Sequence, residues 1–367
     1  MNLEFQEYRT RKILNTYKHV DGWFWNKYSA HPYVGCRSGC EFCYLRGGVH
    51  LGRRDPNTFD THIQVKMNAI ELFKRELARV EKEVVSCGDW QQPAEERYTL
   101  SRQMLLVVRD AAFPLFIVER SPLLARDIDL LAEIQQRADV RIVISLSNVD
   151  EKLKRIFEPR SPGIKRRLKM MAALANVGIP VGTSLMPILP FIGDRKDQIE
   201  DAIRATKDHG GTYIVAGGLT MAGVQAERSL GAAREYDPAT EEKWRKFFNW
   251  REGGQPNYGP TRKYNANLGL RVRELCAKHD LKDRMPRPIR YAKFPFNKRV
   301  AEKLLLKVYD LELGQAHTSH IWTYRKAAWA IDELSYSVEG KSEKELQGIE
   351  GVSTNVTHEI ADWAKEN

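Results

Sequence analysis

Cysteine is scarce in this chain, with only five among 367 residues. A small, odd number of cysteines does not fit a disulfide-stapled secreted domain and is typical of a reducing compartment, where thiols are kept for chemistry. Long apolar runs are absent too, since none approaches the roughly 18 residues of a membrane span. Residues 1–19 are charged throughout and lack the apolar region of a signal peptide. These absences predict a cytoplasmic protein with no membrane partner.

The composition that is present is ordinary for a globular protein. Hydrophobic residues make up 42% of the chain and charged residues 29%. At about 150 residues per domain, the length predicts two to three domains. A chain of this length buries a core without disulfides or metals to hold it together.

Short β-branched segments alternate with amphipathic segments from about residue 28 to residue 220. The predicted strands are Ala30–Val34, Glu83–Ser86, Pro114–Glu119, Arg141–Ser147, Pro180–Met186 and Thr212–Ala216. The predicted helices are Val65–Leu77, Leu100–Val108, Leu123–Gln136, Ile164–Val177 and Gln198–Asp208. Such alternation implies parallel strands joined by right-handed crossovers. We therefore predict an α/β fold, a partial (βα)6 TIM-like barrel, with its chemistry at the carboxyl ends of the strands.

Three of the cysteines stand together after the first predicted strand. Cys36, Cys40 and Cys43 have C-x3-C-x2-C spacing in a loop that is too polar for a core. Thiolates this close normally bind metal. Three ligands suit a catalytic zinc, for which His31 or His50 offers a fourth ligand, or an iron–sulfur cluster with one iron left open.

This spacing, after the first strand of a βα array, resembles the radical S-adenosylmethionine (SAM) superfamily. The resemblance implies a [4Fe–4S] cluster on Cys36, Cys40 and Cys43, with SAM chelated to the open iron. Reduction then gives a 5′-deoxyadenosyl radical that abstracts a hydrogen atom from the substrate, while the protein positions the cofactors. It also implies a reducing partner such as flavodoxin or ferredoxin, and it places Phe42 against the adenine of SAM.

Further motifs are similar to the spore photoproduct lyase branch of the superfamily, which returns a thymine dimer photoproduct in DNA to two thymines. They cover about residues 28–220 and are His31–Cys36, Cys43–Leu45, Cys87–Glu95, Glu119–Asp127, Phe157–Arg160 and Met186–Pro190. This similarity implies a lyase that acts on duplex, lesion-containing DNA.

Two residues would take part directly in the radical chemistry by this resemblance. Cys87 stands 44 residues after Cys43, near the place of a cysteine that gives a hydrogen atom to the product radical. A thiol is suited to that role because its S–H bond is weak, and the alternative is a small buried residue at a strand end. Tyr44 matches a tyrosine thought to relay the radical, or else packs against the cluster loop.

The resemblance places the SAM contacts at the ends of later strands. Ser86 matches the region that meets the amino group of SAM, and Arg120 stands where relatives often carry a lysine that meets the carboxylate. Arginine keeps the charge but offers a planar fork instead of a point charge. Ser145 and Ser147 alternate along the fourth strand, where the superfamily contacts ribose or carboxylate. Each of the two could instead be an ordinary strand residue facing a helix.

The positive charge of the chain is concentrated in one segment. The whole chain has a net charge of +10, and residues 241–310 alone hold 18 Lys and Arg against 8 Asp and Glu. Ten aromatic residues are interleaved with these charges. This combination suits a nucleic-acid surface, because cations contact phosphates and aromatic rings stack on bases. The alternative is a solvated face above a local core.

Residues 321–367 predict a small all-α module. The segment Ile349–Ser353 follows the apolar-x-Gly-apolar-Gly pattern of a helix–hairpin–helix, whose turn holds a DNA phosphate with backbone N–H groups. The whole module resembles the helical N-terminal domain of family X DNA polymerases. Ser353 replaces the second glycine and Glu350 adds negative charge, and both disfavour phosphate binding. The alternative is a helical appendage for protein contacts.

Together these patterns predict four segments: an N-terminal extension (1–27), a radical SAM partial barrel (28–232), a basic aromatic region (233–320) and a helix–hairpin–helix module (321–367). The expected function is that of a radical SAM lyase that repairs a UV photoproduct in DNA. Two alternatives remain open at this point. One is a radical SAM enzyme that modifies RNA or a protein, and the other is a DNA-binding protein with a structural iron–sulfur cluster.

Overall fold

A sheet of parallel strands forms the centre of the computed structural model, which describes residues 3–47, 54–88 and 90–365. Six strands follow one another in chain order and pair in parallel with their neighbours. They are β3 (Tyr28–Ala30), β6 (Val85–Gly88), β7 (Leu115–Glu119), β8 (Val140–Ser145), β9 (Val181–Ile188) and β10 (Tyr213–Gly218). The predicted α/β fold with a parallel sheet is therefore confirmed.

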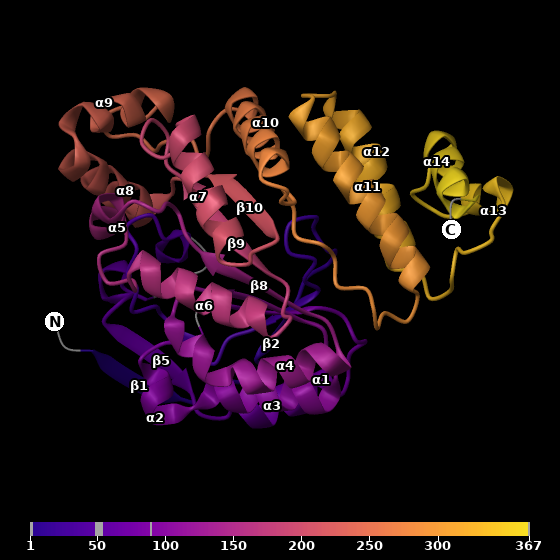
Figure 1. Cartoon of the computed structure of the whole chain (residues 1–367), viewed down its shortest axis with the longest axis horizontal. Coiled ribbons are helices and arrows are strands. Elements are labelled where there is room, and N and C mark those ends of the chain that lie inside the picture. The colour runs from indigo at the N-terminus through magenta and orange to yellow at the C-terminus, as the bar shows by residue number, and fades with distance from the viewer. Residues whose placement is uncertain (1–2, 48–53, 89, 366–367) are drawn as a thin grey trace.

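Amphipathic helices cover one face of this sheet (Figure 1). They are α1 (Ala69–Leu77), α3 (Leu100–Ala111), α4 (Ile128–Arg137), α6 (Ile164–Asn176) and α7 (Lys196–Asp208). Their apolar residues recur at helical spacing, so each helix presents one apolar side to the sheet. Leu105, Leu131 and Leu174 are fully buried there against alternate strand residues such as Ile117 and Ile142.

The first 27 residues do not form a separate extension. β1 (Glu4–Tyr8) pairs with β5 (His62–Lys66) and β5 with β4 (Tyr33–Val34), which makes a second, three-stranded sheet. β2 (Leu14–Thr16) adds an antiparallel edge to β3 in the main sheet. The N-terminal segment thus supplies a strand to each sheet.

Three predicted elements differ from the elements in the structure. The predicted strand Ala30–Val34 is divided between β3 and β4, which lie in different sheets. The predicted helix Val65–Leu77 begins only at Ala69, because Ile63 and Val65 alternate into the core of the small sheet and belong to β5. The predicted helix Leu123–Gln136 opens as a 3-10 turn, η4 (Pro122–Asp127), with Pro122 at its start, and continues as α4.

The other face of the sheet is covered by aromatic residues of the N-terminal segment and by C-terminal helices. Phe24 stacks on Phe116 of β7 with ring centres 5.1 Å apart. Trp25 is fully buried, and its indole N–H donates to the carbonyl oxygen of Met285 at 2.8 Å. Side chains therefore cover this face near the amino ends of the strands. The carboxyl ends of the strands remain available for a site.

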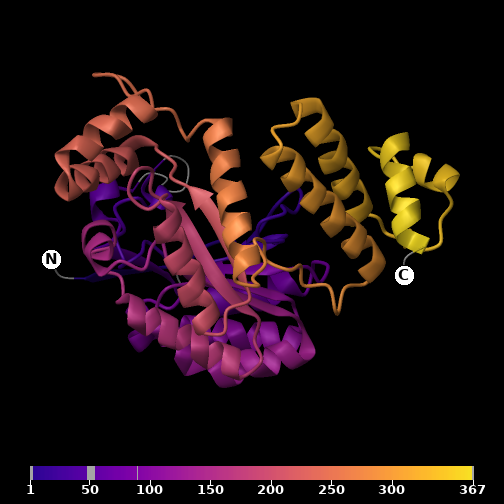
Figure 2. The ribbon, with the colours of Figure 1, turned by 45° about the horizontal axis from the view of Figure 1, so that its top comes forward.

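The remaining elements of secondary structure in the described residues are helices. The shorter ones within the first half are α2 (Ala94–Tyr98) and α5 (Glu151–Phe157). The later ones are α8 (Gly223–Tyr236), α9 (Pro238–Phe247), α10 (Arg262–Lys278), α11 (Pro295–Leu313), α12 (Thr318–Asp332), α13 (Glu343–Gln347) and α14 (Thr354–Lys365). Figures 1 and 2 show α11 and α12 side by side, with α13 and α14 beyond them. None of the described helices combines the length and the apolar character that a bilayer crossing requires.

The predicted segment boundaries do not coincide with breaks in this architecture. The boundary at 232/233 falls inside α8, and the boundary at 320/321 falls inside α12. Apolar residues of α11 to α14, among them Leu304, Ala328 and Val356, share one core with residues of the main sheet such as Val143. The C-terminal helices therefore continue an apolar core that begins at the sheet, and α13 and α14 lie farthest from the sheet (Figure 1).

The segment predicted as a helix–hairpin–helix forms a short helix, α13, a turn and the longer α14. Gly351 has φ +89° in this turn, a conformation that favours glycine. The carbonyl oxygen of Ser353 accepts hydrogen bonds from the N–H groups of Val356 and Thr357, both at 3.0 Å, where α14 begins. Ser353 and Glu350 are exposed. The helix–hairpin–helix assignment itself stays a prediction.

Candidate active site

The three clustered cysteines lie on a tight loop between β4 and the 3-10 turn η1 (Tyr44–Arg46). Cys36 and Cys40 are buried and Cys43 is half-buried, and none of the three forms a disulfide. Gly39 has φ +55°, and a Cβ atom there would lie 2.4 Å from the guanidinium of Arg160. The positive φ of this turn favours glycine.

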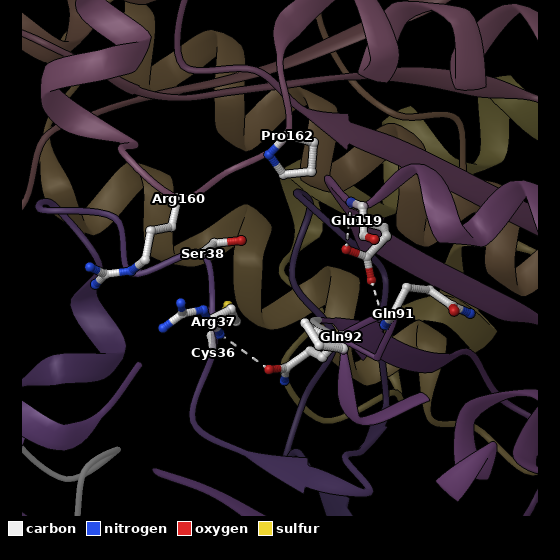
Figure 3. A pocket seen from close by; sticks show the side chains of 10 residues that line it. Cys36, Arg37, Ser38, Gln91, Gln92, Glu119, Arg160 and Pro162 are labelled. Atoms are coloured by element: carbon white, nitrogen blue, oxygen red, sulfur yellow. Dashed lines mark hydrogen bonds between the residues drawn. The ribbon is translucent and has the colours of Figure 1, made fainter. Parts of the chain in front are cut away.

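A cavity of about 130 Å³ opens beside this loop (Figure 3). Its wall is formed by the cysteine loop, by the segment after β6, by the end of β7 and by the segment after α5. The lining residues are Cys36, Arg37, Ser38, Gln91, Gln92, Pro93, Glu119, Ser121, Arg160 and Pro162. The cavity thus lies at the carboxyl ends of the parallel strands, where the sequence predicts the chemistry.

Gln92 fixes the cysteine loop to the end of β6. Its side-chain oxygen accepts the N–H of Arg37 at 3.2 Å, and its side-chain nitrogen donates to the carbonyl oxygen of Gly35 at 2.8 Å (Figure 3 shows the first bond). These two bonds bracket Cys36 on both sides. Gln92 therefore positions the first thiol relative to the sheet.

Arg120 connects the cysteine loop to the sheet. Its guanidinium donates to the thiol sulfur of Cys40 at 2.8 Å, to the carboxylate of Glu158 at 3.0 Å and to the hydroxyl of Ser145 at 3.1 Å. Burial raises the pKa of the Cys40 thiol, and the charge of Arg120 opposes that rise. The cation is therefore placed where it stabilises a thiolate.

Glu158 is the centre of a buried charged network. Its carboxylate lies 2.7 Å from the guanidinium of Arg167 and accepts the hydroxyl of Ser147 at 2.5 Å, in addition to its bond with Arg120. Burial by itself would raise the pKa of Glu158, but the charges of Arg167 and Arg120 outweigh it and hold that pKa below its usual range. Glu158 is therefore ionised and holds Arg120 in place.

The structure brings Arg120, Ser145 and Ser147 together, as the sequence predicts for residues that contact one ligand. Ser86 lies in β6, half-buried, beside Phe116 of β7. Phe42 is buried in the apolar core that also holds Cys40. These placements are consistent with contacts to SAM, which stay predictions.

The two predicted catalytic residues lie in contrasting places. Tyr44 is 57% exposed at the end of the cysteine loop. Cys87 lies near the carboxyl end of β6, as predicted, but its side chain belongs to the apolar core between the sheet and the helices and is fully buried. Since successive strand residues point to opposite faces, Cys87 and Ser86 face in opposite directions. Burial in this core raises the pKa of the Cys87 thiol well above its ordinary value.

Several residues of the site carry no predicted role. Glu158 belongs to the segment Phe157–Arg160, which the sequence singles out only by resemblance, and Gln92 belongs likewise to Cys87–Glu95. Arg167 lies inside an amphipathic helix and is almost completely buried. A buried arginine in a helix otherwise packed by apolar residues is the signal that could have indicated a charged partner.

One of the two residues considered as a fourth zinc ligand makes a contact away from the loop. The Nδ1 atom of His31 lies 3.2 Å from the carbonyl oxygen of Gly88, and His50 lies outside the described residues. Within the described part of the chain, no three His, Cys, Asp or Glu side chains converge on the position of one metal ion. In an iron–sulfur cube each thiolate binds its own iron, so the ligands are spread around the cluster.

Comparison with known proteins shows what this part of the chain is similar to. The family model described as the radical SAM superfamily matches residues 31–206, which include the cysteine loop, Arg120 and Glu158. Residues 31–206 are therefore similar to a radical SAM domain. The cofactors of a radical SAM domain are a [4Fe–4S] cluster and SAM.

Solved structures share the fold of the radical SAM domain. A spore photoproduct lyase mutant with bound AdoMet and dinucleoside spore photoproduct superposes with a TM-score of 0.55 at 16% identity. The match covers 77% of this chain and 81% of that chain. At this identity the likeness shows a common fold.

Curated relatives also resemble the chain in sequence. An uncharacterized protein of Mycobacterium tuberculosis is 29% identical over 269 residues, which are 71% of this chain and 77% of that protein. An uncharacterized protein of Methanocaldococcus jannaschii is 27% identical over 171 residues, 46% of this chain and 62% of that protein. The similarity to the first relative extends beyond the length of the radical SAM domain.

The residues of the cysteine loop fit the cluster of a radical SAM domain. Three thiols that form no disulfide lie on one loop, and the guanidinium of Arg120 contacts one of them. Arg46 is completely buried next to the loop, 3.1 Å from the carboxylate of Asp60. Cations of this kind stabilise the negative charge that thiolate ligands bring to a buried site.

The basic segment 241–310 is less of a nucleic-acid surface than its sequence suggests. Five of its ten aromatic side chains are buried, namely Trp244, Phe248, Trp250, Phe296 and Tyr309. Arg284 is also buried, 3.4 Å from the ring centre of Tyr309 and 4.2 Å from that of Trp23. Exposed cations remain at Lys243, Arg251, Lys263, Lys293 and Arg299. The local core that the sequence offered as an alternative therefore accounts for half of the rings.

Proposed function

We propose that this chain is a radical SAM lyase that repairs a photoproduct in DNA, as the spore photoproduct lyases do. The main support is the cavity between the cysteine loop and the carboxyl ends of β6 and β7. The fold around this cavity is shared with a lyase whose structure was solved with AdoMet and a dinucleoside photoproduct. A cavity at this edge of a parallel sheet is the place where such folds bind substrates.

In this proposal the cysteine loop and its neighbours hold the cofactors. Cys36, Cys40 and Cys43 bind the [4Fe–4S] cluster, and Phe42 lies against the adenine of SAM. When bound and reduced, the cluster cleaves SAM and supplies a radical that abstracts a hydrogen atom from the substrate.

The strand ends orient SAM in this proposal. Arg120, held by Glu158 and Ser145, binds the carboxylate of SAM, while Ser86 and Ser147 orient its polar groups. Tyr44, exposed at the end of the cysteine loop, is proposed to relay the radical. A reducing partner such as flavodoxin or ferredoxin supplies the electron.

The test of the activity is an anaerobic assay of the reconstituted, reduced enzyme on UV-irradiated DNA, followed by mass analysis of the products. Restored thymine together with 5′-deoxyadenosine supports the lyase. Formation of 5′-deoxyadenosine with RNA or protein, and not with irradiated DNA, supports the second candidate function. That candidate, a radical SAM enzyme that modifies RNA or a protein, is favoured by the burial of half of the rings in the basic segment. No 5′-deoxyadenosine under any condition would favour a structural cluster.

Replacing Cys87 by alanine tests its predicted role as hydrogen donor. A donor role predicts that 5′-deoxyadenosine still forms while the yield of correctly restored base falls and by-products rise. It also requires the thiol to reach the substrate from the helix-covered face of β6, where it is fully buried. A packing role, which this burial favours, predicts unchanged yield and purity. Product analysis by mass spectrometry separates the two.

Binding of duplex DNA is expected to weaken steeply as salt is added. The exposed cations of the basic segment would contact phosphates, and each contact releases counterions on binding. A plot of log affinity against log salt should have a slope of about −0.9 per phosphate contact. Fluorescence anisotropy with labelled duplexes measures it. A flat salt dependence would assign the basic segment to another partner.

A further inference from the structure

Phe191 is an exposed ring at the tip of the turn that follows β9. Its side chain is 45% exposed, and its backbone has φ +63°. This is the left-handed region, which a bulky residue adopts only under strain. Strain of this kind persists where the surrounding structure imposes it, and it clusters at functional sites.

The backbone on both sides of Phe191 is fixed by its neighbours. The carbonyl oxygen of Pro190 accepts the indole N–H of Trp244 at 2.9 Å, and the N–H of Gly193 donates to the carbonyl oxygen of Leu189 at 2.8 Å. Leu189 and Ile192 are buried in the same apolar core as Cys40 and Phe42. The turn that carries Phe191 is thus built on the core of the cysteine loop.

The ring of Phe191 contacts one neighbouring ring, while 45% of the side chain stays exposed. Phe191 packs against Phe247 with ring centres 5.2 Å apart at 79°, and Phe247 packs against Tyr264 at 4.9 Å and 74°. The hydroxyl of Tyr264 donates to the carboxylate of Asp194 at 2.7 Å. This series of contacts fixes the orientation of an exposed ring.

Two other exposed rings lie near the same end of the sheet. Tyr44 follows Cys43 directly and is 57% exposed. Tyr258 is 66% exposed, and its carbonyl oxygen accepts the N–H of Met221, shortly after β10, at 2.7 Å. The exposed side chain of Lys263 lies at the start of α10, one residue before Tyr264. Exposed rings on which bases stack and exposed cations that contact phosphates are the features with which proteins bind single strands.

We propose that Phe191 is a stacking platform for an unpaired nucleobase of the substrate. The inference rests on the proposed function and deepens it. Bases within an intact duplex are already stacked on one another, so the ring binds a base in a single strand or one extruded from the helix. A ring that is fixed before binding loses little conformational freedom when the base arrives.

The experiment measures binding of a thymine-rich single-stranded oligonucleotide that contains 2-aminopurine, a base whose fluorescence is quenched by stacking. Phe191→Leu removes the aromatic face, and Phe191→Asn removes it with a residue that tolerates positive φ. Phe191→Trp keeps an aromatic face. The matched control is Tyr17→Leu, because Tyr17 is 44% exposed and directly follows β2, the edge strand opposite β10.

Both variants without a ring are expected to bind about tenfold more weakly and to lose most of the quenching. The slope of log affinity against log salt should not change, because the ring carries no charge. Phe191→Trp and Tyr17→Leu should behave like the native chain. Thermal melting shows which variants are folded, and Phe191→Asn should melt no lower than Phe191→Leu.

Native affinity and quenching in Phe191→Asn would overturn the platform. The proposed function would then still stand if the native chain acts on irradiated DNA. A native chain that binds no nucleic acid at all would overturn both the proposed function and the platform.

Discussion

Replacing Cys36, Cys40 and Cys43 together by alanine is expected to abolish iron binding and SAM cleavage. The three thiols lie on one tight loop, and a cube bound by three cysteines has no substitute ligand once all of them are removed. Anaerobic reconstitution of the native chain should give about four irons per chain, as a [4Fe–4S] cube implies. Iron analysis and detection of 5′-deoxyadenosine measure the loss.

The matched control is Cys276→Ala. Cys276 is as buried as the cysteines of the loop, but it lies in α10 among Leu275 and other apolar residues. Its replacement should leave both iron content and SAM cleavage at the native level. Undiminished iron in the triple variant, or stoichiometric zinc in the native chain, would contradict the assignment of the loop.

Replacing Glu158 by glutamine is expected to lower stability by about 3 kcal/mol or more. The carboxylate balances the charges of Arg120 and Arg167, and all three groups lie in or near the protein interior. Removing one partner of a buried ion pair leaves the other charge uncompensated. Arg120 would also lose the contact that orients it, so the affinity for SAM should fall. Denaturant unfolding and equilibrium binding of SAM measure the two effects.

Glu274→Gln is the matched control, since Glu274 pairs with Lys196 on the surface at 2.9 Å and both side chains are more than half exposed. Exposed pairs of this kind contribute little, so neither stability nor SAM affinity should change. A Glu158→Gln variant as stable as the native chain, with unchanged SAM affinity, would show that the buried network does not position Arg120.

The contribution of Glu158 to stability has a defined dependence on pH. Its folded-state pKa is held below the unfolded value of 4.5 by Arg167 and Arg120. The stabilisation is therefore fully present above pH 4.5 and is lost as the pH falls through the folded-state pKa. The native chain should consequently exceed Glu158→Gln in stability at pH 7, and the difference should shrink in acid.

The order of strands and helices in the main sheet follows closely from the sequence, because each strand is a short β-branched segment and each helix has an apolar side. The small sheet could not be predicted in the same way. Its strand β5 lies beside β1, with Ile63 opposite Phe5, and this pairing joins segments almost sixty residues apart. Local periodicity does not indicate such a partner strand. The sequence therefore predicts a helix from Val65, although Val65 and Lys66 belong to β5.

The residues of the site also divide into those that a local sequence pattern predicts and those whose partners lie far along the chain. The cysteine loop is a local pattern, and its spacing is visible in the sequence. Glu158 and Gln92 act through partners far along the chain, and neither role can be predicted before the fold brings the partners together. Cys87 illustrates a third case, because a strand has two faces and a shift of one residue reverses the side chain. Placing a cysteine at a strand end does not say which face it occupies.

The contact between Trp25 and Met285 has a consequence for how the chain is made. The two residues are 260 positions apart. Together with Phe24 they pack against the face of the main sheet that the amphipathic helices do not cover. A chain leaving the ribosome presents Trp25 and the first strands long before Met285 and α11 exist. Native contacts of such high sequence separation slow folding, and until they form the apolar residues remain accessible to other molecules. Completion of the core therefore follows synthesis of the C-terminal helices.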